Sequence, residues 1–143
     1  MAVLRQGLGL VTGTFETSIT WDKWPDFDEK VRRATLDAIN RACGGGTLNC
    51  RFTHVYTDGP APYYTYTGKY TAGAYFEQQE AIKRAASNAI IEAGGSITHH
   101  HAVGRIHRPW YDRQRPDLFS DSLRAVKKVC DPSGILNPGV LID

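Results

Sequence analysis

The sequence predicts an α+β fold with a ferredoxin-like split βαβ core, in which a four-stranded antiparallel sheet carries two helices on one face. Three observations predict it. Segments with alternating apolar and polar residues flank two segments whose apolar residues recur at helical spacing. Their order is strand, helix, strand, strand, helix, strand. Glycines and prolines stand at the boundaries between them.

The first strand and the first helix occupy the N-terminal third of the chain. Side chains alternate in character from Leu10 to Trp21, which predicts a half-buried strand. Pro25 suits the first turn of a helix, because proline's missing N–H has no partner there. Apolar residues then recur at helical spacing from Phe27 to Ala42, and the glycines at 44–46 stop the helix.

Two further strands are expected before the second helix. The second strand covers about residues 48–57, with one face made of Cys50, Phe52, His54 and Tyr56. The Asp58-Gly59-Pro60 sequence is typical of a turn. The third strand covers about residues 62–70 and is rich in tyrosine and threonine, which favour a pleated surface.

The second helix and a short fourth strand complete the predicted core. The helix spans about residues 75–93 and ends at Gly94-Gly95. The fourth strand covers 96–100, so the core domain is expected to span residues 1–104. Residues 105–143 form a C-terminal extension with a polar loop to 115, a third helix from Pro116 to Cys130 and an extended tail that contains turns.

Composition and charge exclude several classes of protein. The chain has 143 residues, enough for one domain with a core, and 41% of them are hydrophobic. A net charge of +2 does not argue for a nucleic-acid partner. No apolar stretch reaches the length that spans a bilayer. The three cysteines lack CxxC spacing and indicate reduced thiols, so we expect a cytoplasmic protein.

The most informative motif is a run of three histidines, His99, His100 and His101, between Gly94-Gly95 and Gly104. Imidazoles exchange protons near pH 7 and are poor core residues. In an extended segment His99 and His101 would share one face and His100 the other. The run therefore predicts a pocket wall, with a solvated loop as the alternative.

Five stretches give the chain its resemblance to a known family. They are 13–18 with Trp21, 57–59 followed by 63–65, 94–104, 108–110, and 131–139 with its Asn-Pro-Gly ending. Together they resemble the C-terminal half of the alkyldihydroxyacetonephosphate synthases, which are FAD-dependent enzymes of the vanillyl-alcohol-oxidase type. The histidine run within its glycines is the most specific part, whereas the Asn-Pro-Gly ending is shared by flavin-linked oxidases more widely.

The resemblance implies a function and a set of site residues. These synthases exchange the acyl chain of acyl-dihydroxyacetone phosphate for a fatty alcohol in ether lipid synthesis, with no net oxidation. The matching positions imply that Tyr63, His99, His100 and His101 are catalytic proton-transfer residues. They also imply that Arg5 contacts the substrate phosphate, with a frayed terminus as the alternative, and that Asn137 belongs to the cofactor site.

The resemblance also implies a partner. FAD would be bound mostly by a separate flavin-binding domain or subunit that precedes residue 1, and residues 105–143 would pack against it. The glycine-rich segment 7–13 leads into a strand rather than a helix, so it does not match a dinucleotide-binding fingerprint. We therefore expect the isolated chain to be inactive. Association with a second copy of the chain is left open.

Two other functions remain open at this stage. One is an FAD-linked oxidase or dehydrogenase of 2-hydroxy acids, in which a histidine takes the hydroxyl proton. The other is a non-catalytic ferredoxin-like module that assembles with a partner through residues 131–143. A metal site is not expected, because adjacent histidine side chains diverge and no cysteine is spaced to complete four ligands.

Overall fold

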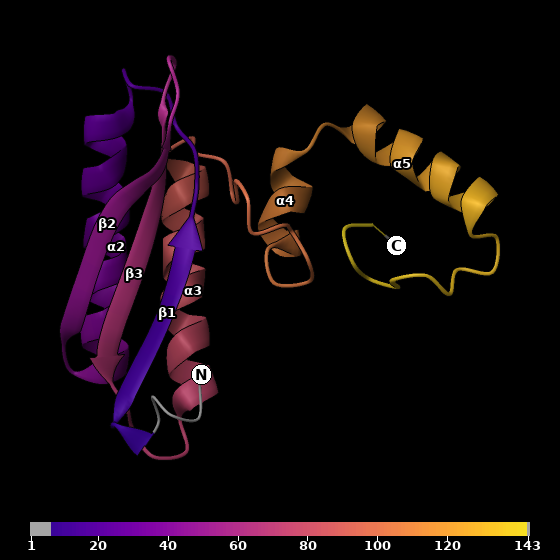
Figure 1. Cartoon of the computed structure of the whole chain (residues 1–143). Coiled ribbons are helices and arrows are strands. Elements are labelled where there is room, and N and C mark those ends of the chain that lie inside the picture. The colour runs from indigo at the N-terminus through magenta and orange to yellow at the C-terminus, as the bar shows by residue number, and fades with distance from the viewer. Residues whose placement is uncertain (1–6, 143) are drawn as a thin grey trace.

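The computed structural model describes residues 7–142 and confirms an α+β architecture. Arg5 lies outside the described residues, so its predicted role stays a prediction. Figure 1 shows a sheet with two long helices on one side and a C-terminal extension that leads away from it. The elements are, in chain order, β1 (Leu10–Glu16), α2 (Trp24–Cys43), β2 (Gly46–Val55), β3 (Pro60–Lys69), α3 (Tyr75–Glu92), α4 (Arg108–Gln114) and α5 (Asp117–Cys130).

The prediction of four strands is wrong: over the described residues the sheet has three, in the order β1-β3-β2, and both pairs are antiparallel. The segment predicted as the fourth strand donates only one backbone hydrogen bond toward the β1 side, from Ser96 N to Ser18 O at 3.0 Å. The N–H groups of His99, His100 and His101 point instead at the carboxylate of Glu16. A strand ladder cannot form where a side chain takes these donors.

The two faces of the sheet carry different side chains and have different surroundings, because side chains alternate along a strand. On one face α2 and α3 cover a core that includes Phe15, Phe27, Ile39, Tyr64 and Ile82. The other face carries no helix in Figure 1. Glu16 is the neighbour of Phe15 in β1 and therefore faces the side without helices, which we call the open face.

The ends of the two long helices follow the expected signals. Pro25 lies in the first turn of α2, and Gly44 caps its C-terminus with a φ of 68°. A positive φ costs glycine little, because it has no Cβ. Gly95, which follows α3, is a second constrained position: a Cβ there would lie 2.5 Å from the Phe27 ring. Glycine thus lets the chain leave α3 in contact with the core.

A β-bulge interrupts the pairing of β2 with β3. Phe52 pairs with Pro62 and His54 pairs with Ala61, so β2 advances two residues while β3 advances one. The sequence prediction placed Phe52 and His54 on one face, and the bulge is why that is wrong. His54 shares the open face with Ala61, whereas Phe52 contacts Trp24 of α2 with ring centroids 5.0 Å apart.

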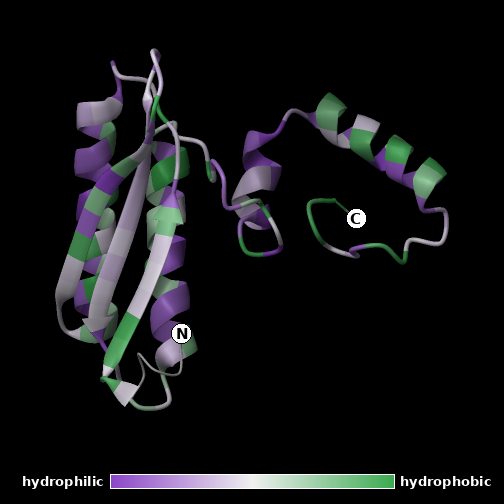
Figure 2. Ribbon diagram, viewed as in Figure 1, coloured by the Kyte–Doolittle hydropathy of each residue, from purple (hydrophilic) through white to green (hydrophobic). Residues whose placement is uncertain are grey.

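The C-terminal extension contains one helix that the sequence analysis treated as a loop, α4, which lies against α3. The indole nitrogen of Trp110 donates to Asn88 Oδ1 at 2.7 Å. Helix α5 lies apart from the sheet, and Figure 2 shows that it carries both hydrophobic and hydrophilic residues. The large apolar side chains exposed on α5 and the following tail are Leu118, Phe119, Val126, Val129, Ile135 and Leu136.

The tail after α5 contains turns. Asp131 accepts hydrogen bonds from the N–H groups of Ile135 and Leu136, each at 3.1 Å. Arg105 and Arg115 then hold the returning tail by donating to the carbonyl oxygens of Pro138 and Leu141, at 2.6 Å and 3.1 Å. No helix among the described residues is both long and apolar enough to cross a membrane.

Candidate functional site

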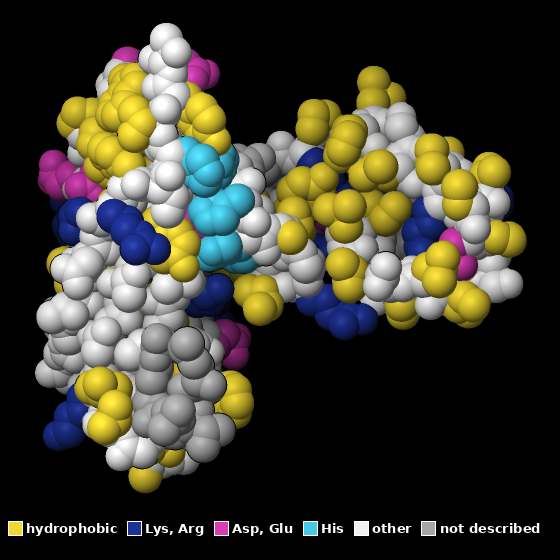
Figure 3. Space-filling model, in the orientation of Figure 1, with side chains coloured by type: hydrophobic (Ala, Val, Ile, Leu, Met, Phe, Trp, Pro, Cys, Tyr) yellow, Lys and Arg dark blue, Asp and Glu magenta, His cyan; other side chains and the backbone are white. Residues whose placement is uncertain are grey.

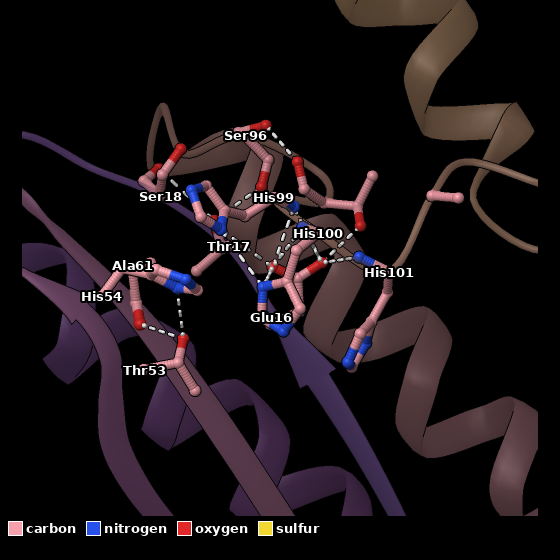
Figure 4. Close-up of polar contacts among 12 residues, drawn as sticks. Glu16, Thr17, Ser18, Thr53, His54, Ala61, Ser96, His99, His100 and His101 are labelled. Carbon is pink, nitrogen blue, oxygen red and sulfur yellow. Dashed lines mark hydrogen bonds and ion pairs between the residues drawn. The ribbon is translucent and has the colours of Figure 1, made fainter.

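The histidine segment is built around one buried carboxylate, that of Glu16, whose side chain is 1% exposed. Glu16 Oε1 accepts the N–H groups of His99, His100 and His101 at 2.8, 3.1 and 3.0 Å, together with the hydroxyl of Thr98 (Figure 4). Successive N–H groups aimed at one anion form the concavity known as a nest. The backbone of the histidine segment is therefore fixed by a side chain of β1.

These hydrogen bonds also fix the charge of Glu16. Burial would raise the pKa of its carboxyl, but the Thr98 hydroxyl and the backbone N–H groups of the histidines outweigh burial and lower it below its usual value of 4.5. Glu16 is ionised at neutral pH as a result. It acts as an anchor, since a carboxylate without a proton cannot serve as an acid.

The segment is also held at its N-terminal end. Thr17 Oγ1 donates to Ser96 O at 2.6 Å, and the N–H of Ile97 donates to Gln114 Oε1 at 3.0 Å. Gln114 lies at the end of α4 and also donates to Gly95 O at 2.9 Å. The histidine backbone is thereby clamped between β1 and α4. Figure 3 shows the histidine side chains gathered in one column on the molecular surface.

The tyrosines of β3 lie on two different faces of the sheet, as the alternation of side chains along a strand predicts. Tyr64 is buried against Phe15 and donates to Asp28 Oδ1 at 2.7 Å, and Tyr66 is buried as well. Both are core residues. Tyr63 is half-buried on the open face, with its ring centroid 6.0 Å from His100 and 5.3 Å from His101. The structure thus brings Tyr63 together with the histidines that the sequence analysis selected.

Tyr63 lies in a row of three residues that are paired directly across the sheet. Glu16 of β1 and Arg51 of β2 are its partners in the strand register. The Arg51 guanidinium carbon lies 4.9 Å from the centre of the Tyr63 ring, a cation–π contact. The sequence analysis assigned no role to Glu16 or Arg51. A signal for Glu16 was present, because it belongs to the Phe-Glu-Thr-Ser stretch that carries the resemblance.

The imidazole rings have different surroundings. His99 Nε2 lies 3.0 Å from Tyr56 Oη, and its Nδ1 lies 3.2 Å from His100 Nδ1. His100 Nδ1 is also 3.2 Å from Glu16 Oε2. Burial lowers the pKa of His101, and nearby His100 adds to that effect, whereas Glu16 opposes it. His101 is consequently a neutral imidazole at pH 7 and able to accept a proton.

A cleft of about 600 Å³ borders the segment beside His99, with Ser18, Lys23, Tyr56, Asp58 and Gln114 among its other lining residues. It gives the His99 side of the cluster access to small molecules. The other predicted site residue, Asn137, lies elsewhere. It is exposed in the tail after α5, where its carbonyl accepts the N–H of Val140 at 3.2 Å, and its predicted contact with the cofactor stays a prediction.

Comparison with known proteins gives relatives for almost the whole chain. It is 34% identical over 142 residues to an alkyldihydroxyacetonephosphate synthase of Caenorhabditis elegans, covering 94% of this chain and 23% of the relative. It is 27% identical over 128 residues to the enzyme of that name from Trypanosoma brucei brucei, covering 90% of this chain and 21% of the relative. The chain thus spans less than a quarter of the length of these relatives.

A solved structure has the same fold. An alkyldihydroxyacetonephosphate synthase superposes with a TM-score of 0.64 and 19% sequence identity, over 94% of this chain and 22% of that one. The family model described as "FAD linked oxidases, C-terminal domain" matches residues 2–141. The chain therefore belongs to the family of FAD-linked oxidase C-terminal domains.

Proposed function

We propose that this chain forms the substrate-side wall of an FAD-dependent active site that exchanges the acyl group of an acyl-dihydroxyacetone phosphate for a fatty alcohol. The relatives of that name match 90–94% of the chain, although it covers only 21–23% of their length. The observation that carries the proposal is the placement of Tyr63 beside His100 and His101 on the open face of the sheet.

The proposed exchange needs a group that removes a substrate C–H proton and a group that assists the departing acyloxy oxygen. An imidazole of the histidine run takes the first role. His101 suits it because its ring is held neutral, and His99 and His100 lie beside it as further acceptors. The Tyr63 phenol takes the second role by donating its proton, and the cation–π contact with Arg51 holds the ring in place.

Glu16 and Arg51 are positioning residues in this proposal. Glu16 accepts hydrogen bonds from the backbone N–H groups of all three histidines. One anion therefore fixes the backbone from which the three imidazole rings extend. Such fixed placement matters because general acid–base catalysis requires hydrogen-bond reach between the groups that exchange a proton.

When bound, FAD would supply the electron-accepting chemistry that protein side chains lack. The open face suits the wall of such a site, since it is free of helices and carries an aromatic ring and proton-transfer groups. The pyrophosphate is expected to bind outside this chain, because the described glycine-rich segment runs directly into β1 and opens no long helix.

The flavin-binding domain is the proposed partner of the C-terminal extension. Helix α5 exposes an apolar face, with Leu118 81% and Val129 80% accessible, and the tail adds Ile135 at 75%. Apolar surface gathered on one helix is typical of an interaction site. In this arrangement residues 7–104 present the site residues and the extension holds the chain on its partner.

A second candidate is an oxidase or dehydrogenase of 2-hydroxy acids. It is favoured by two relatives that match less than half of the chain, the glycolate oxidase subunit GlcD of Bacillus subtilis (33% identical, 44% of this chain) and a D-2-hydroxyglutarate dehydrogenase of Stutzerimonas stutzeri (31% identical, 46% of this chain). In that reaction a histidine would accept the proton of the substrate hydroxyl group.

One reconstitution distinguishes these functions. The chain is combined with the flavin-binding domain, and the complex is assayed for alcohol-for-acyl exchange and for dye reduction by 2-hydroxy acids. Exchange without dye reduction supports the synthase reaction. Dye reduction without exchange supports the oxidase and overturns our proposal. A flavin-loaded complex that does neither would leave the chain as an assembly module.

A further inference from the structure

We propose that His54, His99 and His100 form a binding site for a divalent transition-metal cation of the zinc class. The sequence argued against a metal because adjacent histidines diverge, but the fold brings in a third ring from β2. Each of the three side chains offers a ring nitrogen, and these nitrogens all lie within 4.8 Å of one another. The site goes beyond the proposed flavin reaction: it shares His99 and His100 with that reaction and leaves the His101 imidazole outside the triangle, and its test does not depend on the reaction.

The three rings form a nearly equilateral triangle. Their centroids are 5.1 Å apart for His54 and His99, 5.4 Å for His54 and His100, and 5.4 Å for His99 and His100. Three imidazoles on a tetrahedral zinc ion, with Zn–N bonds of about 2.0–2.1 Å, have centroids roughly 5.2 Å apart. The unligated rings are therefore already spaced as a three-histidine metal site requires.

The nitrogen atoms of the two adjacent histidines converge as well. His99 Nδ1 and His100 Nδ1 are 3.2 Å apart. The edge of a tetrahedron of zinc ligands is roughly 3.3 Å, from the same bond length. These two histidines converge because Glu16 holds both N–H groups and bends the backbone away from an extended strand, in which successive side chains would point to opposite faces.

Neighbouring groups orient the rings as in known metal sites. A ligating histidine generally makes a hydrogen bond with its second nitrogen, which fixes the tautomer. His99 Nε2 contacts Tyr56 Oη at 3.0 Å, and His54 Nδ1 contacts Thr53 Oγ1 at 3.2 Å. We therefore assign Nδ1 of His99 and Nε2 of His54 as ligands, with Nδ1 of His100 as the third.

The charge beside the site favours a cation. The carboxylate oxygen Oε2 of Glu16 lies 3.2 Å from His100 Nδ1 and 3.8 Å from His99 Nδ1. It offsets the charge of a bound ion at close range. His54 and His100 are exposed, so a position remains open on the ion for water or an anionic oxygen. Three histidines with one open position is the ligand set of a catalytic zinc site.

The experiment measures binding of the metal alone. The full chain is stripped with a chelator and titrated with ZnCl2 by calorimetry and with CoCl2 by visible absorption, without flavin. We expect one ion per chain and the intense visible bands of four-coordinate cobalt. His54→Asn should weaken binding by at least about 100-fold, because removing even an outer-shell partner costs 10–100-fold. The control is His101→Asn, which changes an exposed histidine of the same run outside the triangle.

Two results would overturn the site. One is the absence of one-to-one binding to the wild-type chain. The other is equal affinity of the wild-type chain and the His54→Asn variant, which would mean that the ion binds histidines indiscriminately. Circular dichroism checks that each variant is folded, and His100→Asn replaces His54→Asn if that variant is not. Neither result bears on the flavin reaction, because the readout is binding rather than turnover.

Discussion

Replacing Glu16 by glutamine tests whether one carboxylate organises the histidine segment. The carboxylate accepts four donors, the Thr98 hydroxyl and the N–H groups of His99, His100 and His101. A glutamine has the same shape but keeps one acceptor oxygen and turns an NH2 group toward those donors. Hydrogen bonds to a charged group contribute about 1.5–3 kcal/mol each. Losing one to two of them predicts that the variant is less stable by about 1.5–6 kcal/mol.

The same substitution predicts a dependence on pH. Since the pKa of Glu16 is lowered from 4.5 in the folded chain, its stabilisation is complete well above that value and is lost as the pH falls through the lowered pKa. The stability difference between the wild type and Glu16→Gln should therefore be constant near neutral pH and shrink in acid. Urea unfolding followed by circular dichroism at a series of pH values measures it.

A matched control separates the nest from a general loss of charge. Glu29 on α2 is 74% exposed and lies 3.5 Å from Arg33, so Glu29→Gln should change stability by no more than about 0.5 kcal/mol. The reasoning is refuted if Glu16→Gln is as stable as this control. It is also refuted if the deficit of Glu16→Gln stays the same from neutral pH to acid.

Three further outcomes are expected. Gly95→Ala should destabilise the chain by about 1–3 kcal/mol in urea unfolding, because its Cβ would lie 2.5 Å from the buried Phe27 ring; a neutral effect would contradict the close approach. In the flavin-reconstituted complex, Tyr63→Phe and His100→Ala should each lower turnover on the order of 10²-fold with an unchanged flavin spectrum, whereas wild-type rates would remove both from the mechanism. Leu118→Asp should leave the stability of the chain unchanged, because Leu118 is 81% exposed. It should weaken binding to the flavin domain, measured by calorimetry, by roughly 10-fold or more. Equal affinity of the variant and the wild type would rule out the proposed α5 interface.

The elements that the sequence predicted well are those set by local signals. Helix α2 begins beside Pro25 and ends before Gly44, and α3 ends before Gly94, as the breakers indicate. The two faces of β3 follow from simple alternation, which places Tyr63 on the open face and Tyr64 in the core. In each case the deciding residues lie within a few positions of the element itself.

The errors arise where a distant residue or a backbone irregularity decides. Residues 96–100 show strand-like alternation, but the N–H groups of His99 and His100 are taken by Glu16, more than 80 positions earlier in the chain. No local pattern reports that competition. The bulge between Phe52 and His54 likewise leaves no periodic signal, and it alone decides that His54 meets the histidine run. The motif could be found from the sequence, whereas its partners required the fold.

The bulge has an evolutionary consequence. Since β2 gains one residue at Thr53 relative to β3, loss of that single codon would restore the even alternation but leave the imidazole directly after Phe52, still opposite Ala61 on the open face. Tyr63, Glu16 and the histidine run lie on other segments and would keep their places. The third nitrogen ligand would therefore survive this in-frame deletion, and a lineage would discard it only by replacing the histidine itself, independently of its flavin chemistry.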